Sequence, residues 1–115
     1  MSTPARRIAF RFGLTGRRWG DTGPVVLLLH GRESAPRRFD ELVEPLLASG
    51  RQVIELDDPT DVEASNDARV AEYAAAISEA AVEIPQLESA LVHGLGAAAA
   101  AQALPRGLPV ERLAA

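Results

Sequence analysis

The chain has 115 residues, a net charge of −4 and no cysteine, which fits a single domain and excludes disulfides and thiolate chemistry. Hydrophobic residues make up 47% of the sequence and charged residues 24%, a balance typical of a folded globular domain. The negative charge argues against nucleic acid as a partner, and no apolar run reaches the roughly 18 residues that a membrane span requires.

The 12 basic residues are all arginine, which excludes Schiff-base chemistry and a P-loop lysine. This exclusive use of arginine indicates a GC-rich bacterial gene. No long apolar run follows residues 1–7, so the N-terminus does not resemble a signal peptide. Together with the absence of cysteine, this predicts a cytoplasmic protein.

The first part of the chain predicts a hairpin followed by a buried strand. Residues 8–12 alternate like a half-exposed strand, residues 13–16 read as a turn, and residues 17–19 are expected to pair back. After a loop at 20–24, residues 25–29 are continuously apolar. This run predicts a strand covered on both faces, as in parallel sheets flanked by helices.

A helix and another strand follow. Apolar residues at helical spacing from Phe39 onwards predict an amphipathic helix that ends near Gly50. Pro45 lies inside this pattern and is expected to bend or shorten the helix. Residues 52–56 predict a short strand, and residues 57–61 open a polar loop.

A second helix begins at an N-cap formed by Ser65 or Asn66 and ends before Pro85. Its periodicity separates an apolar face from a polar face. The residues expected on the apolar face are Val70, Tyr73, Ala74, Ile77 and Ala81, and those expected to face water are Arg69, Glu72, Glu79 and Glu83.

The last part of the chain predicts a strand at 89–92 and an alanine-rich helix at 96–104 that packs close to the sheet. Gly107 and Pro109 end this helix, and residues 110–113 begin a strand stub. Strands that alternate with helices imply right-handed crossovers. The predicted fold class is therefore α/β: three layers, with a mostly parallel sheet of about five strands and an N-terminal antiparallel hairpin.

Four stretches carry a recognisable combination of motifs: 19–31 ends in Leu-Leu-Leu-His-Gly, 38–47 is amphipathic, 52–59 ends in Asp-Asp-Pro, and 92–97 reads Val-His-Gly-Leu-Gly-Ala. In this order they resemble the α/β-hydrolase family. The four stretches resemble, in turn, its oxyanion loop, its first helix, its next strand and Asp-x-Pro loop, and its nucleophile elbow Gly-His-Ser-x-Gly. The resemblance extends over about residues 6–113.

The resemblance implies a hydrolase of ester or similar bonds that uses a Ser-His-acid mechanism without a cofactor. It maps the two oxyanion-hole backbone donors to Arg32 and Leu95. The residues expected to line the site are His30, Gly31, His93 and Gly96. Of these, His30 is expected to tie down its own loop, as its counterpart does in the family, and His93 to act as a structural hydrogen-bonding group.

The sequence also departs from the family. The nucleophile position is Gly94, which has no side chain to attack a substrate. Val92 stands where a small residue is expected, and the loop at 57–62 lacks both glycines of the family's Asp-x-Pro-Gly-x-Gly motif. The later strands that carry the family's acid and His are absent. We therefore expect a truncated N-terminal half of the fold, a pseudoenzyme that is inactive as this chain.

Other residues offer weaker alternatives. Ser34, Ser65 and Ser89 are candidate nucleophiles without the context of an elbow, and Ser34 fits a loop or helix-start hydroxyl better. Asp57 and Asp58 could indicate acid–base chemistry or a metal, but adjacent carboxylates usually point apart, which favours a solvated loop. No metal-ligand spacing is visible, so neither a metal nor a cofactor is expected.

Two further interpretations remain open. The stretch 94–99 fits the Gly-x-Gly-x-x-Ala turn of dinucleotide-binding folds, where a helix N-terminus faces a phosphate. However, it lies on the third strand unit rather than the first, and Glu111 does not end a following strand. Alternatively, strand 89–92 would be an exposed edge that makes the chain a small interaction module, pairing as a homo-oligomer. The expected partners are thus a small ester-like or acyl ligand or a second copy, and neither nucleic acid nor a membrane.

Overall fold

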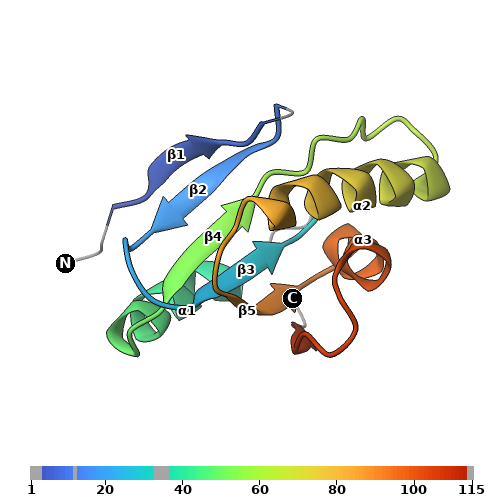
Figure 1. Ribbon diagram of the computed structural model, residues 1–115. Helices are drawn as coiled ribbons and strands as arrows, with labels where there is room; N and C mark the ends of the chain where they lie inside the picture. The colour runs from blue at the N-terminus through green and yellow to red at the C-terminus, as the bar shows by residue number, and fades with distance from the viewer. Residues whose placement is uncertain (1–3, 12, 33–36, 114–115) are drawn as a thin grey trace.

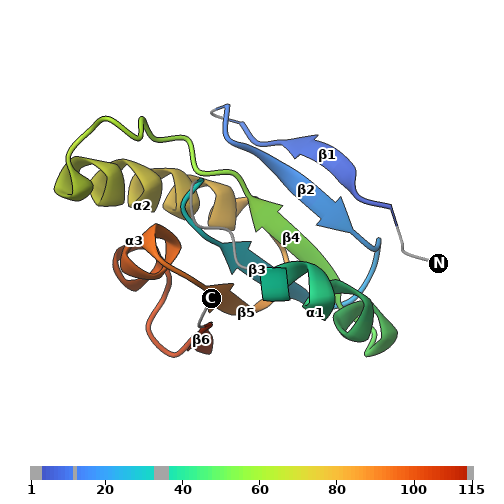
Figure 2. The ribbon, with the colours of Figure 1, turned by 180° about the vertical axis from the view of Figure 1, so that it is seen from behind.

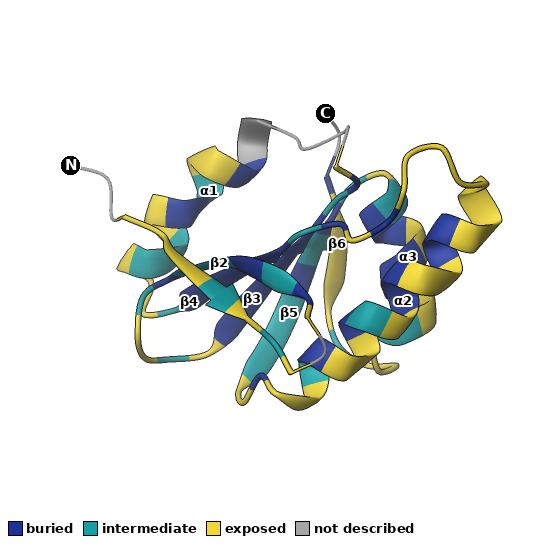
Figure 3. Ribbon diagram, turned by 90° about the horizontal axis from the view of Figure 1, so that it is seen from above, coloured by how far each residue is buried: buried dark blue, intermediate teal, exposed yellow. Residues whose placement is uncertain are grey.

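The computed structural model describes residues 4–11, 13–32 and 37–113. It contains three layers, with a six-stranded sheet between helices (Figure 1). The strands are β1 (Arg6–Ala9), β2 (Thr15–Trp19), β3 (Val25–Leu29), β4 (Gln52–Leu56), β5 (Leu87–Val92) and β6 (Val110–Arg112). The helices are α1 (Arg37–Ala48), α2 (Asn66–Val82) and α3 (Leu95–Ala103). Helix α1 covers one face of the sheet, and α2 and α3 cover the other (Figures 2 and 3).

The strands lie in the order β1-β2-β4-β3-β5-β6. The pairs β4-β3, β3-β5 and β5-β6 are parallel, whereas β1-β2 and β2-β4 are antiparallel. This confirms a mostly parallel sheet with an N-terminal hairpin at one edge. Thr15 and Gly16, which were expected in the turn, already belong to β2.

The expectation of an unpaired edge at 89–92 is wrong. β6 runs parallel to the second half of β5 and pairs with it from Ala90 to Val92. Residues 104–109 turn the chain back along the sheet after α3, so the stub expected at 110–113 becomes the edge strand. The hypothesis of a homo-oligomer that pairs through residues 89–92 therefore loses its basis, because this edge is already paired within the chain.

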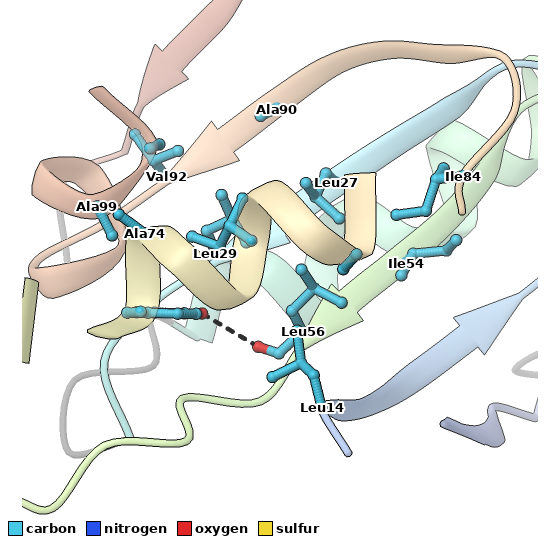
Figure 4. Close-up of a cluster of buried hydrophobic side chains, with 14 of the residues drawn as sticks. Leu14, Leu27, Leu29, Ile54, Leu56, Ala74, Ile84, Ala90, Val92 and Ala99 are labelled. Carbon is cyan, nitrogen blue, oxygen red and sulfur yellow. Dashed lines mark hydrogen bonds between the residues drawn. The ribbon is translucent and has the colours of Figure 1, made fainter. Parts of the chain in front are cut away.

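Two hydrophobic clusters hold the layers together. All five residues of β3 are buried, and because successive side chains point to opposite faces, this one strand contributes to both clusters. Leu27 and Leu29 face α2 and α3 (Figure 4), whereas Val26 and Leu28 face α1. The prediction that residues 25–29 form a strand covered on both faces is therefore confirmed.

The helices follow the predicted periodicity with three differences. Helix α1 continues past Pro45 to Ala48, so the proline does not shorten it there. In α2, Ser65 is the N-cap and its Oγ accepts the Ala68 N–H, but Ala80 rather than Ala81 continues the buried stripe. The third difference is Arg69, which was expected to face water and is instead buried.

Candidate functional site

The carboxyl ends of β3 and β5 meet where the chain changes direction across the sheet. From β3 the chain passes through α1 to β4 on one side, and β5 lies on the other side of β3 and leads to α3 on the opposite face. Ligand sites of open α/β sheets lie outside the strand ends at such a switch point. The His93 N–H donates to the Leu29 carbonyl at 3.0 Å and joins the two strand ends.

The turn between β5 and α3 is a sharp corner. Gly94 has φ 56° and ψ −128°, a backbone conformation that glycine adopts without the strain that a side chain would bring. At Gly96, an added Cβ would lie 2.3 Å from the Leu29 carbonyl oxygen and 2.6 Å from the His30 nitrogen. Only glycine therefore allows α3 to start this close to the end of β3.

Most backbone donors at the start of α3 are already used. The Gly96 N–H donates to the His93 carbonyl and the Ala97 N–H to the Gly94 carbonyl, both at 3.0 Å. Within the described ranges, the Leu95 N–H has no acceptor. Of the first three N–H groups of α3, only that of Leu95 is thus left to face a ligand among the described residues.

A chain of charged groups, centred on the buried Glu55, holds the loop after β3. The Nδ1 of His30 lies 2.8 Å from the Gly31 carbonyl oxygen, and its Nε2 lies 3.0 Å from Oε2 of Glu55. Arg17 contacts the other carboxylate oxygen of Glu55 at 2.6 Å and stacks over Trp19. Because the carbonyl and the carboxylate can only accept, an imidazolium satisfies both contacts of His30.

The pKa values of this pair move in opposite directions. Burial alone would lower the pKa of His30, but its hydrogen bonds to Glu55 and to the Gly31 carbonyl outweigh burial and raise it. Burial alone would raise the pKa of Glu55, but the hydrogen bonds from His30 and Arg17 outweigh burial and lower it. Each group therefore stabilises the charged form of the other.

A second buried network is centred on Asp58, whose side chain is 0% exposed. Its Oδ1 accepts the N–H and the hydroxyl of Thr60, and its Oδ2 accepts the Arg32 N–H at 3.0 Å and an Arg69 guanidinium nitrogen at 2.8 Å. Burial alone would raise the pKa of Asp58, but the bonds from Thr60, Arg32 and Arg69 outweigh it and lower the pKa. The expectation of a solvated loop is therefore wrong at Asp58, because Arg69 turns inward to pair with it.

The neighbouring Asp57 points elsewhere, as expected of adjacent carboxylates. Its Oδ2 accepts a bond from Arg7 at 2.9 Å and the hydroxyl of Thr15 at 2.6 Å. Asp57 thereby fastens the N-terminal hairpin to the carboxyl end of β4, while Asp58 fastens the loop after β3 to α2. Both carboxylates therefore have a structural role: Asp57 at the hairpin and Asp58 at the loop after β3.

A pocket of about 500 Å3, here named the terminal pocket, lies over these loops. It is lined by Gly13, Leu14, Thr15, His30, Arg32, Asp57, Asp58 and Pro59. Its polar side chains already have protein partners: Arg32 donates to the Asp58 carbonyl, and the others are bonded as described above. Within the ranges that the structure describes, no group of His, Asp and Glu could hold a metal ion, and no helix is long and apolar enough to cross a membrane.

Comparison with known proteins rests on structure. No protein-family model and no curated protein matches the sequence. An epoxide hydrolase from an endophytic Streptomyces matches with a TM-score of 0.65 and 25% identity, over 97% of this chain and 37% of that one. The thioesterase domain from the curacin biosynthetic pathway matches with a TM-score of 0.60 and 23% identity, over 96% and 42% of the two chains. Epoxide hydrolase A from Mycobacterium thermoresistibile matches with a TM-score of 0.63 and 20% identity, over 98% of this chain and 39% of that one.

The chain has the α/β-hydrolase fold. It spans less than half the length of these solved structures, and nearly all of it takes part in each match. The resemblance stated from the sequence is thus confirmed at the level of the fold. The activities of these proteins are their own, and none of them follows for this chain from the likeness.

In the α/β-hydrolase fold, the residues expected at the site do gather at the carboxyl ends of β3 and β5. His30, Gly31 and Arg32 follow β3, and His93 and Gly94 follow β5. The Arg32 N–H is occupied by Asp58, so its role as an oxyanion donor stays a prediction, as does that of the Leu95 N–H.

The two candidate serines that the structure describes lie in structural positions. Ser65 caps α2, and Ser89 lies within β5. Ser34 lies outside the described residues. Val92, which stands where a small residue was expected, is buried in the same cluster as the small residues Ala97 and Ala100 of α3.

Sequence reasoning missed Glu55, Asp58 and Arg69 as members of buried networks. Glu55 carried a usable signal, since it is a charged residue inside an otherwise apolar strand, and such a residue is buried only with a partner. The pair of Asp58 and Arg69 carried none, because a loop separates them and helical periodicity alone places Arg69 on the polar side.

Proposed function

We propose that this chain is a catalytically inactive domain of α/β-hydrolase fold. The observation that carries the proposal is the corner at Gly94, where the strand–turn–helix geometry is present and the attacking side chain is not. An active elbow places a hydroxyl at this point, exposed to the substrate and to a histidine base. A glycine keeps the shape of the corner and lacks its chemistry.

The histidines support the same proposal. The chain contains two, and both ring nitrogens of His30 are engaged, by Gly31 and by Glu55. His93 directs its Nδ1 to the Leu113 carbonyl at 2.8 Å, and since a carbonyl only accepts, that nitrogen carries the proton. His93 thus ties the end of β6 to the elbow.

The oxyanion donors give a third line of support. The Arg32 N–H already donates to a buried carboxylate, so a substrate oxygen would have to displace Asp58 to reach it. Loss of a single oxyanion donor costs an active enzyme about 100-fold to 1,000-fold in kcat. With the Arg32 donor occupied, the Leu95 N–H alone offers little stabilisation to a tetrahedral intermediate.

The test uses p-nitrophenyl acetate with the wild-type chain, Gly94→Ser and Gly94→Ala. Both variants place a side chain on a residue with positive φ and therefore carry the same backbone strain. They differ only in the hydroxyl group. We expect no wild-type hydrolysis above that of free imidazole at the same histidine concentration, and no difference between the two variants. Wild-type turnover above the imidazole rate would overturn the proposal. A burst of nitrophenol from Gly94→Ser alone would assign the inactivity to the missing nucleophile rather than to the engaged histidines and donors.

The expected small ester-like or acyl ligand remains a prediction. The terminal pocket, which His30 and Arg32 help to line, has a suitable size, but its polar lining is already paired within the protein. A ligand there would have to compete with these internal bonds.

A further inference from the structure

A second pocket, here named the hairpin pocket, lies at the amino ends of β3 and β4 on the face covered by α2. Its volume is about 260 Å3. Its lining residues are Ile8, Ala9, Phe10, Arg18, Val25, Gln52, Ile54, Glu83, Ile84 and Pro85. It shares no lining residue with the terminal pocket, and Ile54 and Ile84 lie at the same end of the buried cluster in Figure 4.

The pocket exists because α2 does not extend over the hairpin. Figures 1 and 3 show β1 and β2 projecting beyond the helix at this side of the sheet. The Arg11 N–H donates to Oε2 of Glu83 at 2.9 Å and links the hairpin to the end of α2. Seven of the ten lining residues of the pocket are apolar, and its lining surface is divided about equally between polar and apolar atoms, which suits a ligand with one polar end and one apolar end.

Arg18 is the one cation in this wall, and its contacts are unusual for the chain. One guanidinium nitrogen, Nη2, donates to the Asp21 carbonyl and to the side-chain oxygen of Gln52. The Gln52 amide is held in that orientation because its nitrogen donates to the Gly23 carbonyl at 2.8 Å. The Nε of Arg18 is buried and has no acceptor among the described residues.

Both partners of Arg18 are neutral, so its charge is not compensated. Five other arginines pair with carboxylates: Arg6, Arg7, Arg17, Arg51 and Arg69. No carboxylate of the described residues lies within ion-pair distance of Arg18, and its cross-strand neighbour is another cation, Arg6. Glu83 also lines the pocket, but it is exposed and bonds to the Arg11 backbone. An unpaired guanidinium beside apolar walls attracts an anion that carries an apolar body.

We propose that the hairpin pocket binds an aliphatic carboxylate, with the carboxylate at Arg18 and the chain along Ile8, Ile54 and Ile84. The charge selects an acid over an alcohol of the same length. The volume, which is near the lower limit of small-molecule sites, selects one short chain rather than a two-chain lipid.

The test titrates sodium octanoate into the full chain and follows the isoleucine methyl groups by NMR. We expect saturable shifts at Ile8, Ile54 and Ile84, and at least about tenfold weaker binding of 1-octanol, because it lacks the charge. Arg18→Met keeps the apolar stem and is expected to lose at least about tenfold in octanoate affinity. The matched control is Arg51→Met, which removes an arginine outside the pocket and leaves the affinity unchanged.

A second variant keeps the test decisive if Arg18→Met does not fold. Glu83 lines the pocket from an exposed position, so Glu83→Gln removes a carboxylate from the wall, and the amide oxygen can still accept the Arg11 N–H. We expect it to strengthen octanoate binding and to leave octanol binding unchanged. The proposal is overturned if the wild type shows no saturable shifts, if folded Arg18→Met binds octanoate like the wild type, or if Glu83→Gln changes the binding of both ligands equally.

Discussion

The two junctions at the carboxyl end of the sheet are built in opposite ways. After β3, charged side chains hold the backbone: Glu55 holds His30, and Asp58 holds the Arg32 N–H. After β5, residues 93–96 carry no charged side chain, and the absence of side-chain atoms at Gly94 and Gly96 lets the helix start against the neighbouring strand. One junction depends on buried electrostatics and the other on close packing.

This difference supports the proposal that the chain keeps the shape of a hydrolase site without its chemistry. Electrostatic anchoring consumes the donors that a substrate oxygen would need, because the same N–H cannot serve Asp58 and a ligand at once. Close packing keeps the corner at Gly94 and needs no nucleophile to do so. The shape of the site and the chemical groups of the site are therefore separable in this chain.

The largest expected effect is at the junction after β3. Asp58→Ala would remove a fully buried carboxylate, and with it the ion pair to Arg69 and the bonds from Thr60 and Arg32. Breaking a buried ion pair from one side costs about 3–5 kcal/mol, so we expect a loss of this size in the free energy of unfolding, measured with urea.

The double variant Asp58→Leu with Arg69→Met is the control for this prediction. It removes both charges and leaves apolar groups, a replacement that is often nearly neutral. We expect it to be clearly more stable than Asp58→Ala. A double variant as unstable as the single one would mean that the pair contributes through the bonds to Thr60 and Arg32 rather than through charge compensation.

The next effect is at the junction after β5. The Cβ of Gly96→Ala would overlap backbone atoms of β3 at 2.3 and 2.6 Å, and backbone atoms cannot rotate away. We expect a destabilisation of about 3 kcal/mol, at the upper end of the usual range for overpacking. At Gly50, which has a positive φ and open space around its Cα, Gly50→Ala should cost only about 1 kcal/mol. Equal losses would show that α3 can shift away from β3.

The two junctions also differ in how far the sequence predicted them. The glycines, the apolar strand and the alanine run made the close-packed corner predictable, because packing needs are local and follow residue size. The pair of Asp58 and Arg69 was not predictable, since burial of a charge depends on which partner the tertiary fold brings near. For the same reason the edge strand β6 was underestimated: three residues carry little periodicity, and their pairing with β5 is decided by the turn before them.

The dependence of stability on pH should separate the junctions further. The pKa of His30 is raised from its ordinary value of 6.5, so its contribution is complete below that pH and is lost as the pH rises through the raised pKa. The lowered pKa of Glu55 acts on the other side: its contribution is complete above its ordinary value of 4.5 and is lost as the pH falls through the lowered pKa.

Urea unfolding of the wild type and His30→Gln from about pH 5.5 to about pH 8.5 measures the alkaline part of this dependence. We expect the wild type to lose stability relative to the variant as the pH rises above 6.5. Glu55→Gln, which removes the group that holds the proton on His30, should flatten the same difference. Parallel curves for the wild type and His30→Gln would contradict a charged His30.

The smallest expected effect concerns the Gly-x-Gly turn, where we expect NAD and FAD to leave the thermal midpoint unchanged. A dinucleotide phosphate needs several free N–H groups at a helix start, and here the Gly96 and Ala97 N–H groups donate within the turn. A ligand at ten times its Kd would stabilise the fold by about 1.4 kcal/mol, which thermal unfolding detects as a shift of several degrees. Such a shift would mean that the turn opens to bind phosphate. If no shift is seen, packing alone explains Gly96, the second glycine of the Gly-x-Gly turn, because the Leu29 carbonyl oxygen lies where its side chain would be.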